Sequence, residues 1–127
     1  MATAPGCCQV TTTLPDRAAA EQLAATVVGE RWAACAQVAG PISSTYRWHD
    51  GVERAEEWCC HCKTTEAAAA GLRARIRELH PYEVPEILVV PVVDGDPAYL
   101  RWIEASVRTD AHSAGTSLPR APLPPGG

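Results

Sequence analysis

A histidine, a tyrosine and two glutamates lie within the seven-residue segment His80-Pro81-Tyr82-Glu83-Val84-Pro85-Glu86. Imidazole and carboxylate groups suit borderline metals such as Cu²⁺ and Zn²⁺, and Cu²⁺ is favoured by intrinsic affinity. Each proline pushes the residue before it toward an extended conformation, so His80 and Val84 are expected to be extended. A stiff polar loop beside the apolar run at 87–90 is a typical position for a binding site. The segment therefore predicts a site for a metal ion or a small ligand, with His80, Glu86 and Glu83 as metal ligands and Tyr82 as a ligand contact.

The same residues have a structural alternative. A histidine at the end of a helix can hydrogen-bond the last free carbonyl groups, and its positive form meets the negative helix end favourably. Glu86 can pair with an arginine or lysine across a subunit boundary. Both interpretations of the loop stay open at this point.

Composition narrows the class of protein. The chain has 127 residues, the size of one domain, and 46% of them are hydrophobic. A net charge of −4 argues against nucleic acid as the main partner. No apolar run approaches the ~18 residues of a membrane span, and the N-terminus lacks the pattern of a signal peptide. We expect a cytoplasmic protein with reduced cysteines.

The string Cys59-Cys60-His61-Cys62 looks like a metal motif, but its spacing argues otherwise. Neighbouring side chains of a strand point to opposite faces, so Cys60 and Cys62 would point one way and Cys59 and His61 the other. The four side chains could not close one tetrahedral zinc site. Trp58, Cys60 and Cys62 are instead expected to form an apolar face that packs in the core.

Periodicity predicts the order strand, helix, strand, strand, helix, strand, helix. The caps expected for the three helices are Asp16, Thr65 or Thr64, and Asp96 followed by a proline. This order is the α+β ferredoxin-like plan with an extra C-terminal helix. Residues 1–108 form the domain, and the Pro- and Gly-rich residues 109–127 are predicted to be a disordered tail. The expected strands are 7–13, 35–48, 52–63 and 87–93, and the expected helices are about 17–32, 66–79 and 97–107.

The central hairpin, which turns at His49-Asp50-Gly51, is too long for a monomer of this size. Arms of about 12–14 residues reach about 40–45 Å at ~3.3 Å per residue. A compact domain of ~100 residues is only about 34 Å across. The aromatic side chains of Tyr46, Trp48 and Trp58 would be partly uncovered, which predicts a partner subunit over them. The alternative is a bend at Gly40-Pro41 that shortens one arm.

With these motifs in view, the chain resembles the CutA family of divalent-cation tolerance proteins over about residues 9–108. Six motifs carry the resemblance, and the Ala-Ala-Cys and His-Pro-Tyr-x-x-Pro-Glu strings are specific in combination. The motifs are 12–16 (TTLPD), 30–38 (ERWAACAQV), 44–48 (STYRW), 63–64 (KT), 80–86 (HPYEVPE) and 99–103 (YLRWI).

The resemblance implies a homotrimer in which long hairpins of neighbouring subunits complete each other's sheets. It implies a role in tolerance of copper and other divalent cations, and possible Cu²⁺ binding without a required cofactor. The family's copper-binding histidine falls on His80, its acidic ligand on Glu86 or Glu83, and its cysteine on Thr12, whose hydroxyl is a poor copper ligand. Cys35 matches a widespread family cysteine and is expected to be buried for structural reasons. Other residues expected in an inter-subunit cleft are Lys63, Tyr46, Trp48 and Thr12.

Two further classes of function follow from the same chain. One is a trimer that resembles the PII signalling proteins and binds a small anion between subunits through Lys63, Arg47 and Arg101. The other is an enzyme. No nucleophile and base have a spacing that identifies a catalytic pair, so no enzymatic activity is expected. The cleft of a metal-tolerance trimer is the interpretation that the sequence favours.

Overall fold

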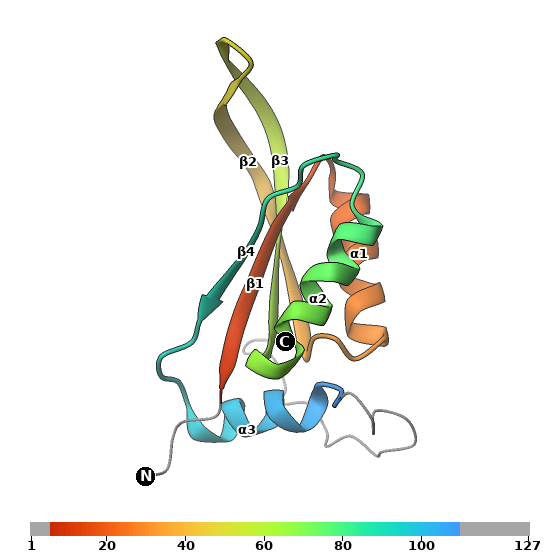
Figure 1. The fold of residues 1–127 in the computed structure, drawn as a ribbon, viewed down its shortest axis with the longest axis vertical. Coiled ribbons are helices and arrows are strands. Elements are labelled where there is room, and N and C mark those ends of the chain that lie inside the picture. Colours follow the sequence, from red (N-terminus) through yellow and green to blue (C-terminus); the bar gives the residue numbers. More distant parts are fainter. Residues whose placement is uncertain (1–5, 110–127) are drawn as a thin grey trace.

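The computed structural model describes residues 6–109, and the predicted tail lies almost wholly outside these residues. The chain follows the predicted order of elements (Figure 1). The bounds are β1 (Cys7–Leu14), α1 (Arg17–Gly29), β2 (Cys35–Trp48), β3 (Gly51–Thr65), α2 (Glu66–Leu79), β4 (Ile87–Pro91) and α3 (Pro97–Ser106).

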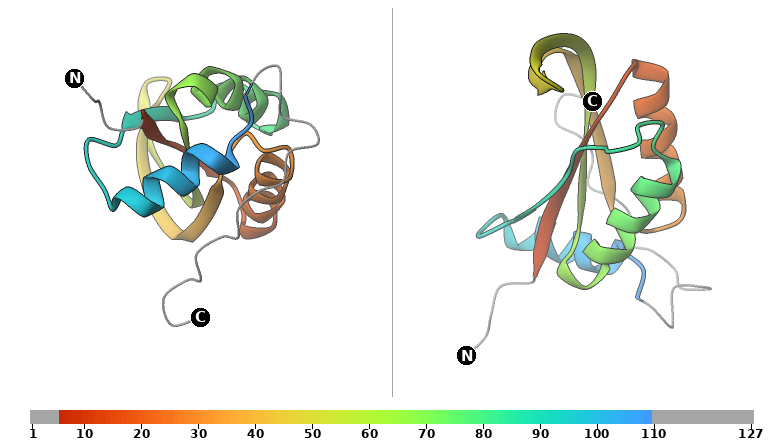
Figure 2. Two further views of the ribbon diagram at one scale, coloured as in Figure 1. Left: turned by 90° about the horizontal axis from the view of Figure 1, so that it is seen from below. Right: turned by 45° about the horizontal axis from the view of Figure 1, so that its top comes forward.

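The four strands form one antiparallel sheet in the order β2-β3-β1-β4. Helices α1 and α2 cover one face of this sheet, and α3 crosses its lower end (Figures 1 and 2). The predicted α+β ferredoxin-like fold with an additional C-terminal helix is confirmed. No helix within the described part of the chain is both long and apolar enough to cross a membrane.

The core lies between the sheet and the two helices. Strand alternation places Val10 and Leu14 of β1 on the helix-facing side, together with Cys60 and Cys62 of β3. They pack against small and branched side chains of both helices, and Trp58 covers the upper rim. The predicted apolar face of β3 is therefore confirmed. The helix residues of this cluster are Ala20, Leu23 and Val27 of α1 and Leu72 and Ile76 of α2.

The three predicted helix caps are present. The side chain of Asp16 accepts a hydrogen bond from the backbone N–H of Ala19 at 2.8 Å. Thr65 and Asp96 accept equivalent bonds at the starts of α2 and α3. Each cap satisfies a backbone donor that the first turn of a helix leaves free, so local sequence determines where these helices begin.

The first helix ends earlier than predicted, at Gly29 instead of about Trp32. Arg31 has a positive φ of 67°, which reverses the chain and returns Trp32 to the helices. The Trp32 ring then lies over α2, where a Cβ atom at Gly71 would be only 2.2 Å from Cζ3 of the ring. The guanidinium of Arg108 lies over the ring, 4.1 Å from its centroid. Packing of one tryptophan against α2 and Arg108 therefore outweighs the local helical pattern.

The β2–β3 hairpin rises well above the rest of the molecule (Figure 1). β2 has its predicted bounds and 14 residues, whereas β3 has 15 residues because it begins at Gly51 and continues to Thr65. The Gly40-Pro41 step forms a bulge between Ala39 and Ile42 without ending the strand. β4 ends at Pro91, two residues before the predicted end. Tyr46 and Trp48 are exposed at 40% and 52%, as expected, whereas Trp58 is half-buried against the core.

Candidate functional site

The loop between α2 and β4 is anchored by the imidazole of His80. This residue is the C-cap of α2, and its extended backbone (φ −78°, ψ 136°) agrees with the prediction. Its Nε2 lies 2.7 Å from the carbonyl oxygen of Thr13, at the end of β1. Its Nδ1 accepts a hydrogen bond of 3.1 Å from the backbone N–H of Tyr82. The side chain thus connects a helix end, a strand end and the turn of the loop.

These two partners determine the protonation state of the ring. A carbonyl oxygen can only accept, so Nε2 carries the proton, and Nδ1 must be unprotonated to accept from Tyr82. Burial lowers the pKa of His80 from its ordinary value, which also favours the neutral form. Both ring nitrogens are engaged, so binding a metal would require His80 to give up one hydrogen bond. Its role as a metal ligand stays a prediction.

Tyr82 connects the loop to the hairpin. Its hydroxyl donates a 2.9 Å hydrogen bond to Oε2 of Glu57 on β3. Burial and this carboxylate raise the pKa of Tyr82 to about 12, so the phenol stays protonated. Burial and the charges of Glu86 and Glu57 also raise the pKa of the Cys59 thiol. The predicted ligand Glu86 therefore acts on the same thiol as a second glutamate. Glu83 and Glu86 are both exposed.

The sheet face opposite α1 and α2, which we call the open face, has a polar centre. Nδ1 of His61 lies 3.1 Å from the hydroxyl of Thr11 and 3.5 Å from the amide of Gln9. Nζ of Lys63 donates to the Gln37 side chain at 2.6 Å. Directly opposite strand residues share a face, so Leu88 and Val90 of β4 flank this polar strip. These two side chains are 56% and 51% exposed, so the open face is apolar along one edge.

Two of the predicted residues lie elsewhere than expected. Thr12 is fully buried on the helix-facing side of β1, so it cannot line a cleft on the open face. Cys35 is half-buried, not buried, and its Sγ lies 3.5 Å from the hydroxyl of Tyr99 at the base of the sheet. Burial and this contact raise the pKa of Tyr99 to about 12. Strand alternation explains both corrections. It turns Thr12, which pairs with Cys60, toward the helices, and it places Cys35 opposite Lys63 on the open face, away from α1 and α2.

The remaining predicted contacts do not converge within one chain. Lys63 pairs with Cys35 at the base of the hairpin, whereas Arg47 pairs with Val52 near its tip. Lys63 and Val52 are 11 steps apart along β3, which corresponds to roughly 36 Å at ~3.3 Å per residue. Tyr46 and Trp48 lie in the upper part of the hairpin, and Arg101 lies on α3. A site that combines these side chains would need more than one copy of the chain.

Sequence reasoning placed Cys59 and His61 on the face opposite Cys60 and Cys62, but it named neither of them, nor Glu57, as a site residue. Their alternation along β3 was a usable signal, because it places all three on the face opposite Cys60 and Cys62. Their partners could not be read in this way, since Tyr82 and Thr11 are distant in the sequence. Within residues 6–109, no group of three or more His, Cys, Asp or Glu side chains is placed to hold a metal ion.

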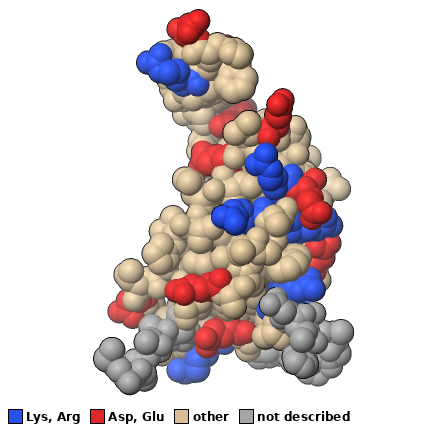
Figure 3. Space-filling view, in the orientation of Figure 1, with Lys and Arg blue, Asp and Glu red and all other residues tan. Residues whose placement is uncertain are grey.

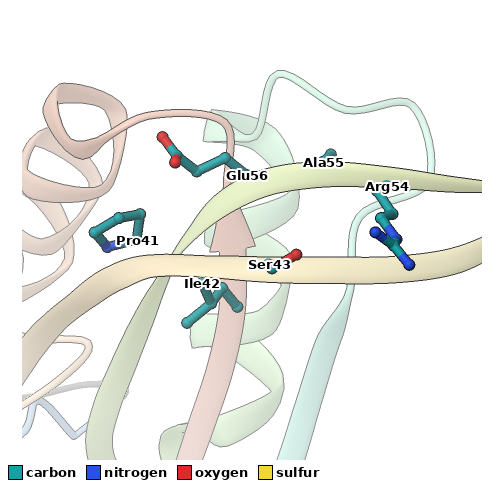
Figure 4. A pocket seen from close by; sticks show the side chains of 6 residues that line it. All are labelled: Pro41, Ile42, Ser43, Arg54, Ala55 and Glu56. Carbon is teal, nitrogen blue, oxygen red and sulfur yellow. The ribbon is translucent and has the colours of Figure 1, made fainter.

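A shallow pocket of about 310 Å³ lies on the hairpin (Figure 4). Pro41 and Ile42 contribute apolar surface, and Arg54 and Glu56 do not point toward one another. Its other lining residues are Ser43 and Ala55. None of the predicted site residues lines this pocket, and its charged groups do not converge on a common point.

Comparison with known proteins now identifies the family. The sequence profile described as CutA1 divalent ion tolerance protein matches residues 8–106, most of the chain. The chain belongs to the CutA1 divalent ion tolerance protein family. The family description names tolerance of divalent ions and no chemical reaction, and the expected absence of catalysis stays a prediction.

Individual relatives of the CutA1 family agree with this assignment. The divalent-cation tolerance protein CutA of Escherichia coli O139:H28 is 42% identical over 96 residues, which are 76% of this chain and 86% of the relative. The structure of CutA1 from Oryza sativa has a TM-score of 0.81 at 30% identity, covering 86% of this chain and all of that chain. A divalent cation tolerance protein from Archaeoglobus fulgidus, described as periplasmic, has a TM-score of 0.77 at 28% identity, with 80% and 99% coverage. The cytoplasmic location expected for our chain stays a prediction.

Proposed function

We propose that this protein acts in divalent-cation tolerance as a homotrimer that takes a divalent metal between its subunits. The proposal that the chain assembles with other copies rests on the projecting β2–β3 hairpin. Tyr46, Trp48 and Val52 are 40%, 52% and 66% exposed on two strands that have no layer beneath them. A soluble monomer seldom leaves such surface open. The number of three subunits comes from the resemblance to the CutA family.

The open face supplies a second surface for a neighbouring copy. β4 pairs with β1 along one edge and with no other described strand, and Leu88 and Val90 are exposed beside it. The visible surface over β1 and β4 carries few charged side chains (Figure 3). An exposed, apolar edge strand tends to pair with another chain. A hairpin from a second copy, lying along this edge, would cover the apolar residues of both elements.

Assembly is tested by the mass in solution of the protein and of two variants. We expect the wild type to have three times the mass of one chain, measured by light scattering after gel filtration. Val90→Glu puts a charge on the open face and should shift the protein to monomers. Val28→Glu makes the same change on α1 and should leave the trimer intact. A monomeric wild type, or equal masses for both variants, would contradict the proposal.

For the metal, we propose that Glu86 is a ligand and that Cu²⁺ or another divalent ion binds at the upper edge of the open face. Glu86 is exposed and acts electrostatically on Cys59 together with Glu57, so negative charge gathers there. Carboxylates from one chain give an incomplete set of ligands, and a neighbouring copy would supply the rest. The proposed metal site does not include His80, because both of its ring nitrogens already make hydrogen bonds to the backbone.

Calorimetric titration with Cu²⁺ tests this assignment. We expect Glu86→Gln to weaken binding about tenfold or more, which is typical for loss of a ligand or its close support. Glu83→Gln should bind as the wild type does, because Glu83 is not among the charges that act on Cys59. His80→Ala should also retain affinity. Loss of binding in His80→Ala with full binding in Glu86→Gln would reverse the assignment.

A further inference from the structure

The lower half of the open face gathers polar side chains around Lys63, which is the only lysine in the chain. Gln9 of β1 and Cys35 of β2 are the direct strand partners of Lys63. His61 is two residues away on β3, and its partner on β2 is Gln37. Residues that are two apart on a strand, or directly opposite on the next strand, share a face of the sheet. These five side chains therefore lie together, and none of them is a carboxylate.

The ammonium group of Lys63 has a neutral partner only. Its Nζ donates a 2.6 Å hydrogen bond to Oε1 of Gln37. An ammonium group has three N–H donors, so two of them remain. Because Oε1 of Gln37 faces Lys63, the NH₂ of the same amide is a further donor. Within residues 6–109, no side chain accepts from this NH₂, and no carboxylate forms an ion pair with Lys63.

The imidazole of His61 adds another donor. Nε2 of Gln9 can only donate, and it lies 3.4 Å from Oγ1 of Thr11 and 3.5 Å from Nδ1 of His61. The Thr11 hydroxyl accepts from Gln9 and donates its own hydrogen to Nδ1, at 3.1 Å. Nδ1 is therefore the accepting nitrogen, and the neutral ring carries its proton on Nε2. This N–H has no acceptor among the described residues.

Negative charge lies outside this group of donors. On the open-face side of β3, the nearest carboxylate is that of Glu57, six residues from Lys63, which corresponds to about 20 Å at ~3.3 Å per residue. Glu104 and Glu66 act electrostatically on Cys7 at the start of β1, and neither forms an ion pair with Lys63 in the described part of the chain. The lower half of the open face therefore combines one positive charge with several unused donors.

Covering of the open face by a neighbouring copy changes what Lys63 requires. In the single chain this side chain is half-buried, and its hydrogen bond to Gln37 lies at the surface. The assembly proposed above would displace the water around it. A buried ammonium group without a counter-charge is costly, and so are buried donors without acceptors. An oxyanion supplies both the negative charge and several acceptor oxygens.

We propose that Lys63, Gln37 and His61 bind a small oxyanion, a phosphate or a carboxylate, on the lower half of the open face. Directly opposite Cβ atoms are about 5 Å apart, and those two residues apart on a strand are about 6.6 Å apart, so two or three oxygens of one anion can accept from these side chains. The strength of binding rests on the proposed assembly, because the covering copy excludes water. The site is distinct from the proposed metal site at Glu86, which takes a cation.

The test measures the melting temperature of the full chain in chloride buffer and with added inorganic phosphate or succinate, at equal ionic strength. We expect the wild type to show a saturable rise at low millimolar concentrations, where general salt effects are small. A rise with phosphate alone identifies a phosphate site, and a rise with succinate alone identifies a carboxylate site. No rise with either anion would overturn the proposal.

Matched variants assign the response to Lys63. Lys63→Met removes the charge and keeps the length of the side chain, and it should weaken anion binding about tenfold or more, as expected for a lost hydrogen bond between charged groups. Arg73→Met removes one positive charge from the exposed side of α2 and should respond as the wild type does. Equal responses of the two variants would contradict the assignment.

Gln37→Glu tests the charge argument in the opposite direction. A carboxylate in this position would pair with Lys63 and supply the missing negative charge from within the chain. This variant should melt above the wild type in chloride and should respond to neither anion. A response as large as that of the wild type would reject the site.

Two further measurements on the wild type do not depend on how the variants fold. Protein labelled with ¹⁵N-lysine gives a single side-chain amine resonance, because Lys63 is the only lysine, and this resonance should shift as the effective anion is added. An unchanged resonance would reject the site. Light scattering on the same samples separates the two proposals. A trimer without an anion response overturns the oxyanion site alone, a monomer with the response overturns the assembly alone, and a monomer without it overturns both.

Discussion

Replacing Gly71 by alanine is expected to destabilise the protein by about 2–3 kcal/mol, a typical cost of overpacking a core. The added methyl group would lie 2.2 Å from Cζ3 and 2.7 Å from Cη2 of the Trp32 ring. The ring cannot shift without losing its contact with Arg108 at 4.1 Å and its position over α2. The loss exceeds the gain of about 1 kcal/mol that alanine brings to a helix interior. Chemical denaturation, monitored by tryptophan fluorescence, measures the change.

Gly29→Ala is the matched control for this prediction. Gly29 is also a helical glycine, at the end of α1, but an added Cβ there meets nothing within 4 Å. We expect this variant to be as stable as the wild type or slightly more stable, because alanine lowers the entropy of the unfolded chain. Equal stability of Gly71→Ala and Gly29→Ala would show that Trp32 does not occupy the described position.

Replacing His80 by alanine should cost about 2–3 kcal/mol near neutral pH, because it leaves two backbone groups without their partner. The carbonyl of Thr13 loses its donor, and the N–H of Tyr82 loses its acceptor. His80→Asn should be intermediate, since an asparagine oxygen can accept from the N–H two residues later. Thermal unfolding of the three proteins measures the difference.

The effect of His80 should depend on pH in a defined direction. Burial holds its pKa below the ordinary value of 6.5, so the unfolded chain binds a proton more readily than the folded one. Its contribution is complete above pH 6.5 and is lost as the pH falls through the lower pKa of the folded protein. The stability gap between wild type and His80→Ala should therefore narrow on acidification.

His49→Asn is the control for the pH experiment. His49 is exposed in the hairpin turn with a φ of 52°, a conformation that asparagine tolerates well. Stability and its pH dependence should match the wild type. A constant gap between wild type and His80→Ala from pH 7.5 to 5 would contradict a neutral, buried imidazole.

Features that depend on near neighbours in the chain could be predicted from sequence. Asp16, Thr65 and Asp96 begin their helices because each cap bonds a backbone group three residues ahead. The burial of Cys60 and Cys62 follows from the two-residue period of a strand. The early end of α1 could not be predicted, because it depends on packing of Trp32 against residues 39 and 76 positions away, Gly71 and Arg108.

The candidate site also combines features set by near neighbours in the chain with features set by distant residues. The types and spacing of residues 80–86 indicated a stiff polar loop, and the extended conformation of His80 follows from the proline after it. Which atoms meet the imidazole depends on residues far away in the chain. Thr13 is 67 positions from His80, and Glu57 is 25 positions from Tyr82. Sequence therefore favoured ligation and capping about equally.

The sequence by itself determined the order of elements, the helix starts, the long hairpin and the family, because these follow from local propensities and motifs. Only the tertiary structure decided that both nitrogens of His80 bond to the protein, that Thr12 faces the core, and that Cys60 and Cys62 meet there. The physical reason is that hydrogen bonds and sulfur contacts require atoms within about 4 Å. Distances of this size between strands and helices are set by packing of the whole chain.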